Sequence, residues 1–182
     1  MNKIEIQKLI TKNGEKIPLS EFTWNEKTST VSTNLEGYCF DFKPMDYMVI
    51  ISGDGSTIKA GHYSTIKAGY NSTINARSGS TINVRSDSTI NAGSGSTISA
   101  GSGSTINAGD DSTVKAGYNS TINAGDDSTV KAGDGSTIDA GYNSAINAGF
   151  DSTIKAGYNS TIKAGDQSVV IRKGVFEVLI NI

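Results

Sequence analysis

Residues 64–71 have the sequence Ser-Thr-Ile-Lys-Ala-Gly-Tyr-Asn, and variants of this octad follow one another without insertion from residue 56 to residue 167. The consensus is S-T-I-[KN]-A-G-x-[NDG], as in STINAGDD at 104–111. A degenerate octad at 48–55 precedes the run, and another degenerate repeat begins at Ser168. A short fixed period indicates a repeat architecture, in which stacked units together bury a core that no single unit can bury alone.

The first five positions of the octad predict a short strand with one buried face. Ser, Ile and Ala at positions 1, 3 and 5 alternate with Thr and a polar residue at positions 2 and 4, and such period-two alternation is typical of a half-buried strand. Positions 6 to 8 hold Gly and often Asn, which tolerate the backbone of a tight corner. Arg77 and Arg85 replace the position-6 glycine, so we expect those two corners to be built differently.

The fold class expected is therefore all-β, a single-stranded β-solenoid of octapeptide repeats. Because the inward Ser and Ala are small, the two walls must lie close together, which favours a flat coil of two octads or sixteen residues. That period would also stack like corners, placing Tyr142 beside Tyr158 and forming an outward asparagine ladder on one wall. A triangular coil of twenty-four residues is the alternative, and it would place Asp139 between Lys115 and Lys163.

The chain divides into three parts by composition. Residues 1–47 hold the only Trp and both prolines, and their composition predicts a β-rich N-terminal cap. We expect residues 48–168 to form the solenoid and residues 169–182 to form capping strands at the C-terminal end. Within the N-terminal part we expect a strand over residues 3–10 and a hairpin that joins residues 28–33 to residues 38–42. The C-terminal part could form a hairpin around Lys173 and Gly174, or pair two molecules into a homodimer through a solenoid end or edge.

Composition sets limits on compartment and partner. The net charge of −2, from 16 basic and 18 acidic residues, argues against direct nucleic-acid binding. Charged residues interrupt every apolar run near the N-terminus, and no segment is apolar for long enough to cross a membrane. The single cysteine, Cys39, suits a reducing compartment, so we expect a cytoplasmic protein with no membrane partner.

The sequence offers no catalytic constellation, and we expect neither enzymatic activity nor a cofactor. The one histidine, His62, lies at a predicted corner, and no cluster of Cys and His has the spacing of a metal site. A calcium site deserves consideration only where the acidic corners at residues 110–111 and 126–127 would meet, because adjacent carboxylates repel unless a cation lies between them. Since most corners lack paired Asp, we expect no metal.

Aromatic corner residues are the best candidates for a binding surface, because they cannot enter the core and because exposed aromatics on a rigid frame are typical of interaction hot spots. The candidate binding site comprises Tyr142, Tyr158, Phe150, Tyr118, Asp110, Asp111, Asp126 and Asp127. A secondary candidate is the N-terminal aromatic group of Phe22, Trp24 and Tyr38.

At the segments AGYNSTIN and AGDDSTVK, the chain resembles the AGYGSTxT octads of bacterial ice-nucleation proteins. This resemblance covers about residues 48–170 and implies a flat sixteen-residue solenoid with ice-binding activity on rows of Thr-x-Thr. Here Lys, Asn, Ser or Asp replaces the second Thr.

In its layout and in the segment SVVIRKGVFEVL at 168–179, the chain also resembles short octad-repeat proteins of tailed phages and prophages. That resemblance implies a mobile-element origin and a non-enzymatic protein that binds a host macromolecule, such as an inhibitor of a defence complex in the manner of an anti-CRISPR protein. The alternatives are an ice-binding protein and a self-assembling structural repeat protein.

Overall fold

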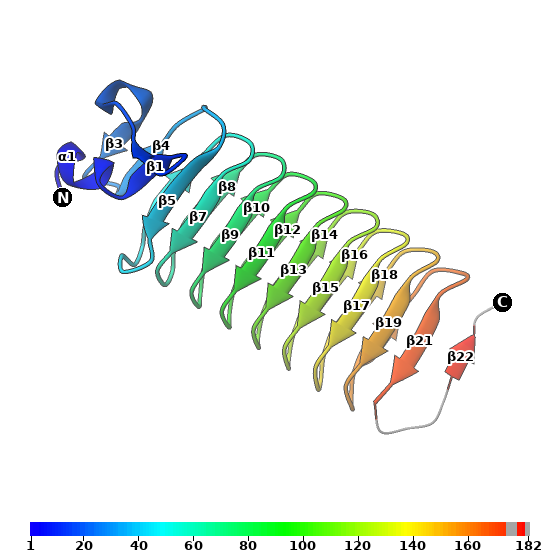
Figure 1. The fold of residues 1–182 in the computed structure, drawn as a ribbon. Coiled ribbons are helices and arrows are strands. Elements are labelled where there is room, and N and C mark those ends of the chain that lie inside the picture. Colours follow the sequence, from blue (N-terminus) through cyan, green and yellow to red (C-terminus); the bar gives the residue numbers. More distant parts are fainter. Residues whose placement is uncertain (174–177, 181–182) are drawn as a thin grey trace.

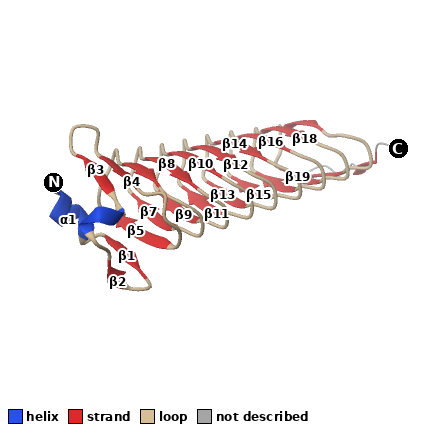
Figure 2. Ribbon diagram, turned by 90° about the horizontal axis from the view of Figure 1, so that it is seen from above, coloured by secondary structure: helices blue, strands red, loops and turns tan. Residues whose placement is uncertain are grey.

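The computed structural model of the chain describes residues 1–173 and 178–180 and shows a flattened rod of stacked coils with a small N-terminal cap (Figure 1). Two parallel sheets form the walls of the rod, and successive octads alternate between them, so each strand pairs with the strand sixteen residues away (Figure 2). The flat sixteen-residue coil is thus confirmed, and the triangular coil is wrong.

The two walls are called sheet A and sheet B, and their outward surfaces face A and face B. The strands of sheet A from the first coil onward are β5 (Tyr38–Phe42), β7 (Thr57–Ala60), β9 (Thr73–Ala76), β11 (Thr89–Ala92), β13 (Thr105–Ala108), β15 (Thr121–Ala124), β17 (Thr137–Ala140), β19 (Thr153–Ala156), β21 (Val169–Arg172) and β22 (Val178–Ile180). Those of sheet B are β4 (Thr30–Ser32), β6 (Val49–Ile51), β8 (Thr65–Ala68), β10 (Thr81–Val84), β12 (Thr97–Ala100), β14 (Thr113–Ala116), β16 (Thr129–Ala132), β18 (Ala145–Ala148) and β20 (Thr161–Lys163).

The predicted inward and outward positions are confirmed. The position-3 Ile or Val of every strand from β7 to β19 is buried, and so are the serines at position 1. Each of these position-1 serines is positioned by hydrogen bonds to neighbouring backbone. Ser80 Oγ, for example, donates to Arg77 O at 2.7 Å and accepts from Ser64 N at 3.4 Å. These bonds satisfy a hydroxyl that would otherwise be costly to bury.

The corners depend on position 8 rather than on the glycine at position 6. In every octad from 56 to 167 the residue at position 8 has φ between 51° and 71°, and it is Asn, Asp or Gly in all but two of them. The glycine at position 6 has another role: a Cβ at Gly93 would lie 2.6 Å from Ser78 N of the preceding coil. Gly79 has the usual positive φ and Arg77 N donates to Ala60 O at 3.3 Å, so the corner at Arg77 follows the common geometry and the expectation of a different bend is wrong there. Asp87 also has a positive φ, but residues 86–87 form a bend in place of the hydrogen-bonded turn of the other corners, so the corner at Arg85 does differ.

The N-terminal cap contains α1 (Lys3–Gln7), β1 (Ile10–Lys12), β2 (Glu15–Lys16), the short 3-10 helix η1 (Leu19–Glu21) and β3 (Thr23–Asn25). The strand expected over residues 3–10 is wrong for most of its length. Asn2 and Glu5 form a capping box, in which Asn2 Oδ1 accepts from Glu5 N at 3.0 Å and Glu5 Oε2 accepts from Asn2 N at 2.8 Å, and this starts the helix.

The hairpin expected between residues 28–33 and 38–42 is also wrong, because β4 and β5 lie in opposite sheets. β4 pairs in parallel with β6 and β5 with β7, so these two strands already belong to a stacked coil. At the other end β21 pairs antiparallel with β22, although Gly174 of the expected hairpin turn lies outside the described residues.

Candidate functional site

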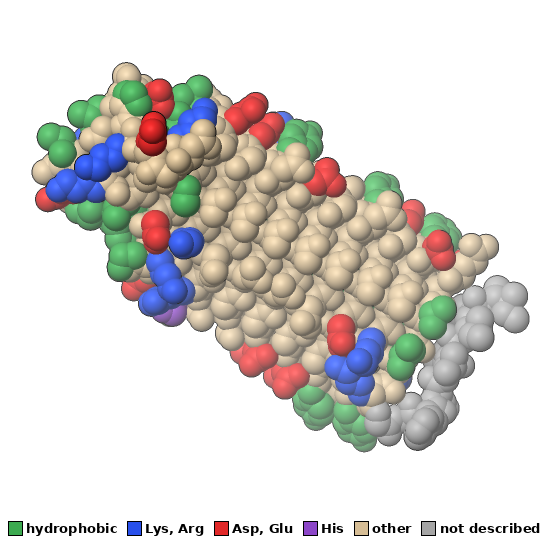
Figure 3. All heavy atoms as spheres, viewed as in Figure 1, with side chains coloured by type: hydrophobic (Ala, Val, Ile, Leu, Met, Phe, Trp, Pro, Cys, Tyr) green, Lys and Arg blue, Asp and Glu red, His purple; other side chains and the backbone are tan. Residues whose placement is uncertain are grey.

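The corners that follow the strands of sheet A form one long narrow edge of the rod, called edge A, and those that follow sheet B form edge B. Near the C-terminal end of edge A, the rings of Tyr142 and Tyr158 stack with centroids 6.2 Å apart and an interplanar angle of 15°. Their residues are 47% and 63% exposed. Along the lower edge of the molecule in Figure 3, acidic side chains are followed by hydrophobic ones toward the C-terminal end. The strand register places both the acidic and the aromatic corners on edge A.

The acidic part of edge A is a row in which each position-7 carboxylate binds the next coil. Asp110 Oδ1 accepts from Asp126 N at 3.0 Å, and Asp126 Oδ1 accepts from Tyr142 N at 2.7 Å. At position 8, Asp127 Oδ1 accepts from Asn143 Nδ2 at 2.6 Å. These contacts fix the negative charges directly beside the tyrosine pair. The predicted juxtaposition of Tyr142 and Tyr158 with the four Asp of edge A is therefore present.

The structure separates Tyr118 and Phe150 from this cluster. Both follow strands of sheet B and lie on edge B, where Phe150 N donates to Asp134 Oδ1 at 2.9 Å. Grouping all the late aromatics into one site is wrong, because successive octads alternate between the two edges.

Two of the three N-terminal candidates are not available on the surface. Phe22 is 2% exposed and Tyr38 is 1% exposed, and both belong to the core of the cap. The Tyr38 hydroxyl donates to Glu21 Oε2, and burial raises the pKa of Tyr38 to about 12, with a further contribution from this hydrogen bond. Trp24 is half-buried, with its Nε1 donating to Met1 O at 2.8 Å. Phe22 and Tyr38 therefore serve packing, which corrects their assignment to a secondary binding surface, whereas for Trp24 that assignment stays a prediction.

Metal binding finds no geometric support at the acidic corners. Over residues 1–173 and 178–180, no three Asp, Glu, His or Cys side chains gather closely enough to hold an ion. His62 instead lies at a corner of edge A, where its backbone N donates to Asp46 Oδ1 at 2.7 Å. In the same part of the chain, no helix has the length and apolar character that crossing a bilayer requires.

The two faces differ in charge, which sequence analysis missed. On face A each lysine of the solenoid is paired: Lys59 Nζ lies 3.4 Å from Asp41 Oδ2, and Lys155 Nζ lies 3.5 Å from Asp139 Oδ2. Between these pairs face A carries a neutral array of Thr and Asn, in which Asn107 Nδ2 donates to Asn91 Oδ1 at 2.9 Å. The predicted asparagine ladder is confirmed, and Figure 3 shows this uncharged central area.

Face B has no acidic residue at any outward strand position. Its outward position-4 residues from β8 to β20 are Lys67, Asn83, Ser99, Lys115, Lys131, Asn147 and Lys163. Sorting the position-4 residues by alternate octads would have revealed this row, whereas the total charge of the repeats conceals it.

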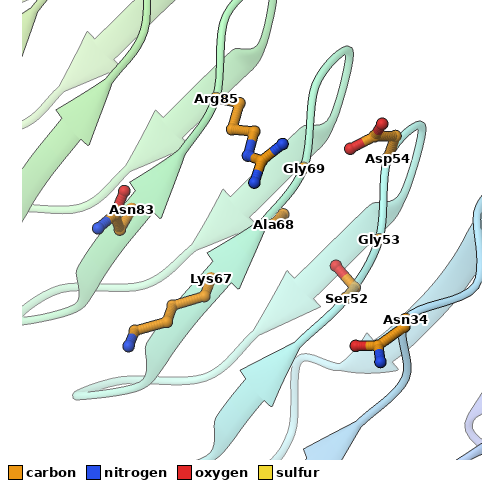
Figure 4. A pocket seen from close by; sticks show the side chains of 9 residues that line it. All are labelled: Asn34, Ser52, Gly53, Asp54, Lys67, Ala68, Gly69, Asn83 and Arg85. Atoms are coloured by element: carbon orange, nitrogen blue, oxygen red, sulfur yellow. The ribbon is translucent and has the colours of Figure 1, made fainter.

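A polar depression of about 390 Å³ lies at the cap end of face B (Figure 4). Arg85 extends toward Gly69, on the side of Asp54, and Lys67 extends along the face in the other direction (Figure 4). The guanidinium of Arg85 also lies 5.0 Å from the ring centroid of Tyr70, a cation–π contact that holds it at edge B.

Comparison of the chain with protein-family models, with curated proteins and with solved structures finds no match.

Proposed function

We propose that the chain is a non-enzymatic interaction protein that binds a protein partner through edge A. The observation that carries this proposal is the exposed, stacked pair of Tyr142 and Tyr158 directly beside a fixed row of carboxylates. Tyrosines held on a rigid backbone lose little conformational entropy on binding, and aromatic residues dominate the energy of many interfaces.

The chemistry of edge A favours a basic partner surface with apolar pockets. The tyrosines would fill the pockets, while the carboxylates of Asp110, Asp111, Asp126 and Asp127 would steer the approach and fix the register. A groove that normally holds nucleic acid has this character. The proposal thus extends to a phage-derived inhibitor of a host defence complex, acting in the cytoplasm, for which the support is the resemblance in sequence layout.

The test is the double substitution Tyr142→Ser and Tyr158→Ser. Serine already occupies position 7 in four other octads, so the fold should be unchanged, whereas partner affinity should fall ~10-fold or more. A partner is first captured from nuclease-treated bacterial lysate, identified, and then titrated in purified form. The matched control is Tyr118→Ser with Phe150→Ser on edge B, which should leave affinity unchanged. Equal losses in both variants would contradict a site on edge A.

A second substitution set tests the carboxylates. Replacing the four Asp of edge A with Asn retains the oxygen that accepts the corner N–H, so coil stacking should survive. Association should slow, and its dependence on salt should weaken, because the steering charge is removed. An association rate that is unchanged at low salt would exclude this role.

Ice binding stays a prediction of the resemblance, and one observation favours it as a second candidate. The central part of face A is an uncharged array of Thr and Asn in register from β9 to β15. Thermal hysteresis of the purified protein is the measurement that would decide this alternative.

A further inference from the structure

The lysines of face B lack the compensation that the lysines of face A have. Lys115 and Lys131 are direct neighbours in the register of β14 and β16, and like charges on adjacent strands are destabilising. Within the described part of the chain, no carboxylate lies within salt-bridge distance of either lysine, nor of Lys67 or Lys163. An anion bound along this row would relieve the repulsion.

A depression of about 440 Å³ runs beside the lysine pair and connects face B to edge B. Its residues come from three successive coils. Lys115, Lys131 and Asn147 line it on the side of the face, and Tyr118 and Asp134 line it on the side of the edge. Its remaining lining residues are alanines and glycines, whose side chains are small or absent.

Exposed aromatic side chains accompany the lysine row along edge B. Tyr118, Phe150 and Tyr70 project from this edge, with Tyr118 59% exposed. Tyr70 carries the stacked guanidinium of Arg85, which adds a cation at the cap end of the row. Cations on one line with aromatics on a parallel line are the arrangement that single-stranded nucleic-acid proteins use to hold phosphates and to stack bases.

We propose that face B binds single-stranded nucleic acid, with phosphates along the lysine row and bases against the aromatics of edge B. The row from Lys67 to Lys163 spans six coils, or about 29 Å at ~4.8 Å per coil, which suits an extended strand. Duplex nucleic acid suits the site less well, because its bases are already stacked on one another and cannot meet Tyr118 or Phe150. This site is independent of edge A.

Two carboxylates of edge B, those of Asp134 and Asp54, do not occupy the place assigned to the phosphates. Asp134 Oδ1 accepts from Phe150 N at 2.9 Å, and Asp54 Oδ1 accepts from Tyr70 N at 2.9 Å, so both side chains are held against the corners. They lie on the aromatic side, whereas the lysines extend from the strands. The nucleic-acid strand would therefore bind in a defined orientation, with its backbone on face B and its bases against edge B.

The probe for this site is a fluorescent oligothymidylate of ~20 nucleotides, longer than the ~4–16 nucleotides that single-strand-binding folds cover. Its anisotropy is measured with the full chain over a series of salt concentrations. Lys115→Asn with Lys131→Asn should weaken binding at least 10-fold and lower the salt slope by about 1.4, since each phosphate contact to a single strand contributes ~0.7. Asparagine already occupies position 4 in six other octads, so the coils should stay intact.

The matched control is Lys59→Asn with Lys155→Asn, which removes the same charge from face A. This variant should keep its affinity for the oligonucleotide within about 2-fold, because these lysines do not contact the nucleic-acid strand. Tyr118→Ser should weaken binding by about 5-fold or more through lost stacking, and Tyr158→Ser on edge A should not. The proposal fails if the oligonucleotide does not bind at low salt, or if both lysine pairs have equal effects. It also fails if a duplex of equal length binds as tightly and Tyr118→Ser has no effect, which would indicate only diffuse attraction to polyanions.

Discussion

The inward serine at position 1 shows how one small residue connects consecutive coils. Its hydroxyl accepts from the backbone N–H of the serine sixteen residues earlier and in many coils donates to a corner carbonyl, as Ser120 Oγ does to Gly117 O at 3.0 Å. The alternation in the sequence predicts that this side chain points inward. It does not predict the hydrogen bonds, because they depend on the coil length.

Ser52 is the exception among the buried hydroxyls. It occupies position 5, where nearly all later octads have alanine, and among the described residues its Oγ is the one buried side-chain polar atom without a partner. An unpaired buried hydroxyl costs ~1–3 kcal/mol, so Ser52→Ala should raise the melting temperature by a few degrees. Ser104→Ala, which removes the acceptor of Ser88 N, should lower it. Equal shifts in the two variants would show that the Ser52 hydroxyl is satisfied in solution.

At the scale of elements, sequence reasoning succeeded in the octads and failed in the cap. Because every octad repeats the same pattern, a wrong structural prediction for one octad is recognised by comparison with the others. In the cap, Tyr38–Phe42 has the alternation of a strand, but alternation does not indicate the partner strand. The parallel pairing of β5 with β7 depends on where the first coil begins, and local sequence does not mark that point.

The contact between Tyr38 of β5 and Glu21 of η1 joins the cap to the first coil, and it should make cap stability depend on alkaline pH. The pKa of Tyr38 is raised to about 12 in the folded chain, above its ordinary value of 10.0. The stabilisation is therefore complete below pH 10 and is lost as the pH rises toward 12.

Tyr38→Phe removes both the hydrogen bond and the titration. At pH 8 urea unfolding should give this variant a lower free energy of unfolding than the wild type. The difference in free energy of unfolding should shrink as the pH rises from 10 to 12. Tyr158→Phe, which alters an exposed phenol, serves as the control. A difference that stays constant over this range would contradict a neutral, hydrogen-bonded Tyr38.

At the scale of the whole molecule, alternate octads give the rod two unlike sides. Sequence analysis placed Tyr142, Tyr158 and the four Asp correctly, because a spacing of sixteen already follows from the corner pattern. It misplaced Tyr118 and Phe150 by neglecting that neighbouring octads belong to opposite edges. It missed the lysine row because composition averages over both faces. The sorting of charge becomes visible only when the residues are assigned to walls.

The interior, in contrast, is the same on both walls, and this leads to a prediction about deletions. Removing residues 88–103 takes out one coil and leaves every later residue on its original face. Removing residues 88–95 shifts every later octad to the opposite wall, yet the inward Ser, Ile and Ala still meet their equivalents. Both deletions should therefore fold and unfold cooperatively, as circular dichroism during thermal unfolding would show.

The two deletions should differ in nucleic-acid binding. The sixteen-residue deletion keeps Lys67 and Arg85 on the side of Lys115 and Lys131, so affinity and salt slope should change little. The eight-residue deletion moves the later lysines to the other wall and separates the two groups. Its salt slope should fall by about 1.4, the loss of two phosphate contacts. Unfolding of the eight-residue deletion alone would show that the two walls are not interchangeable, whereas equal binding by both would show that the lysines do not act as one row.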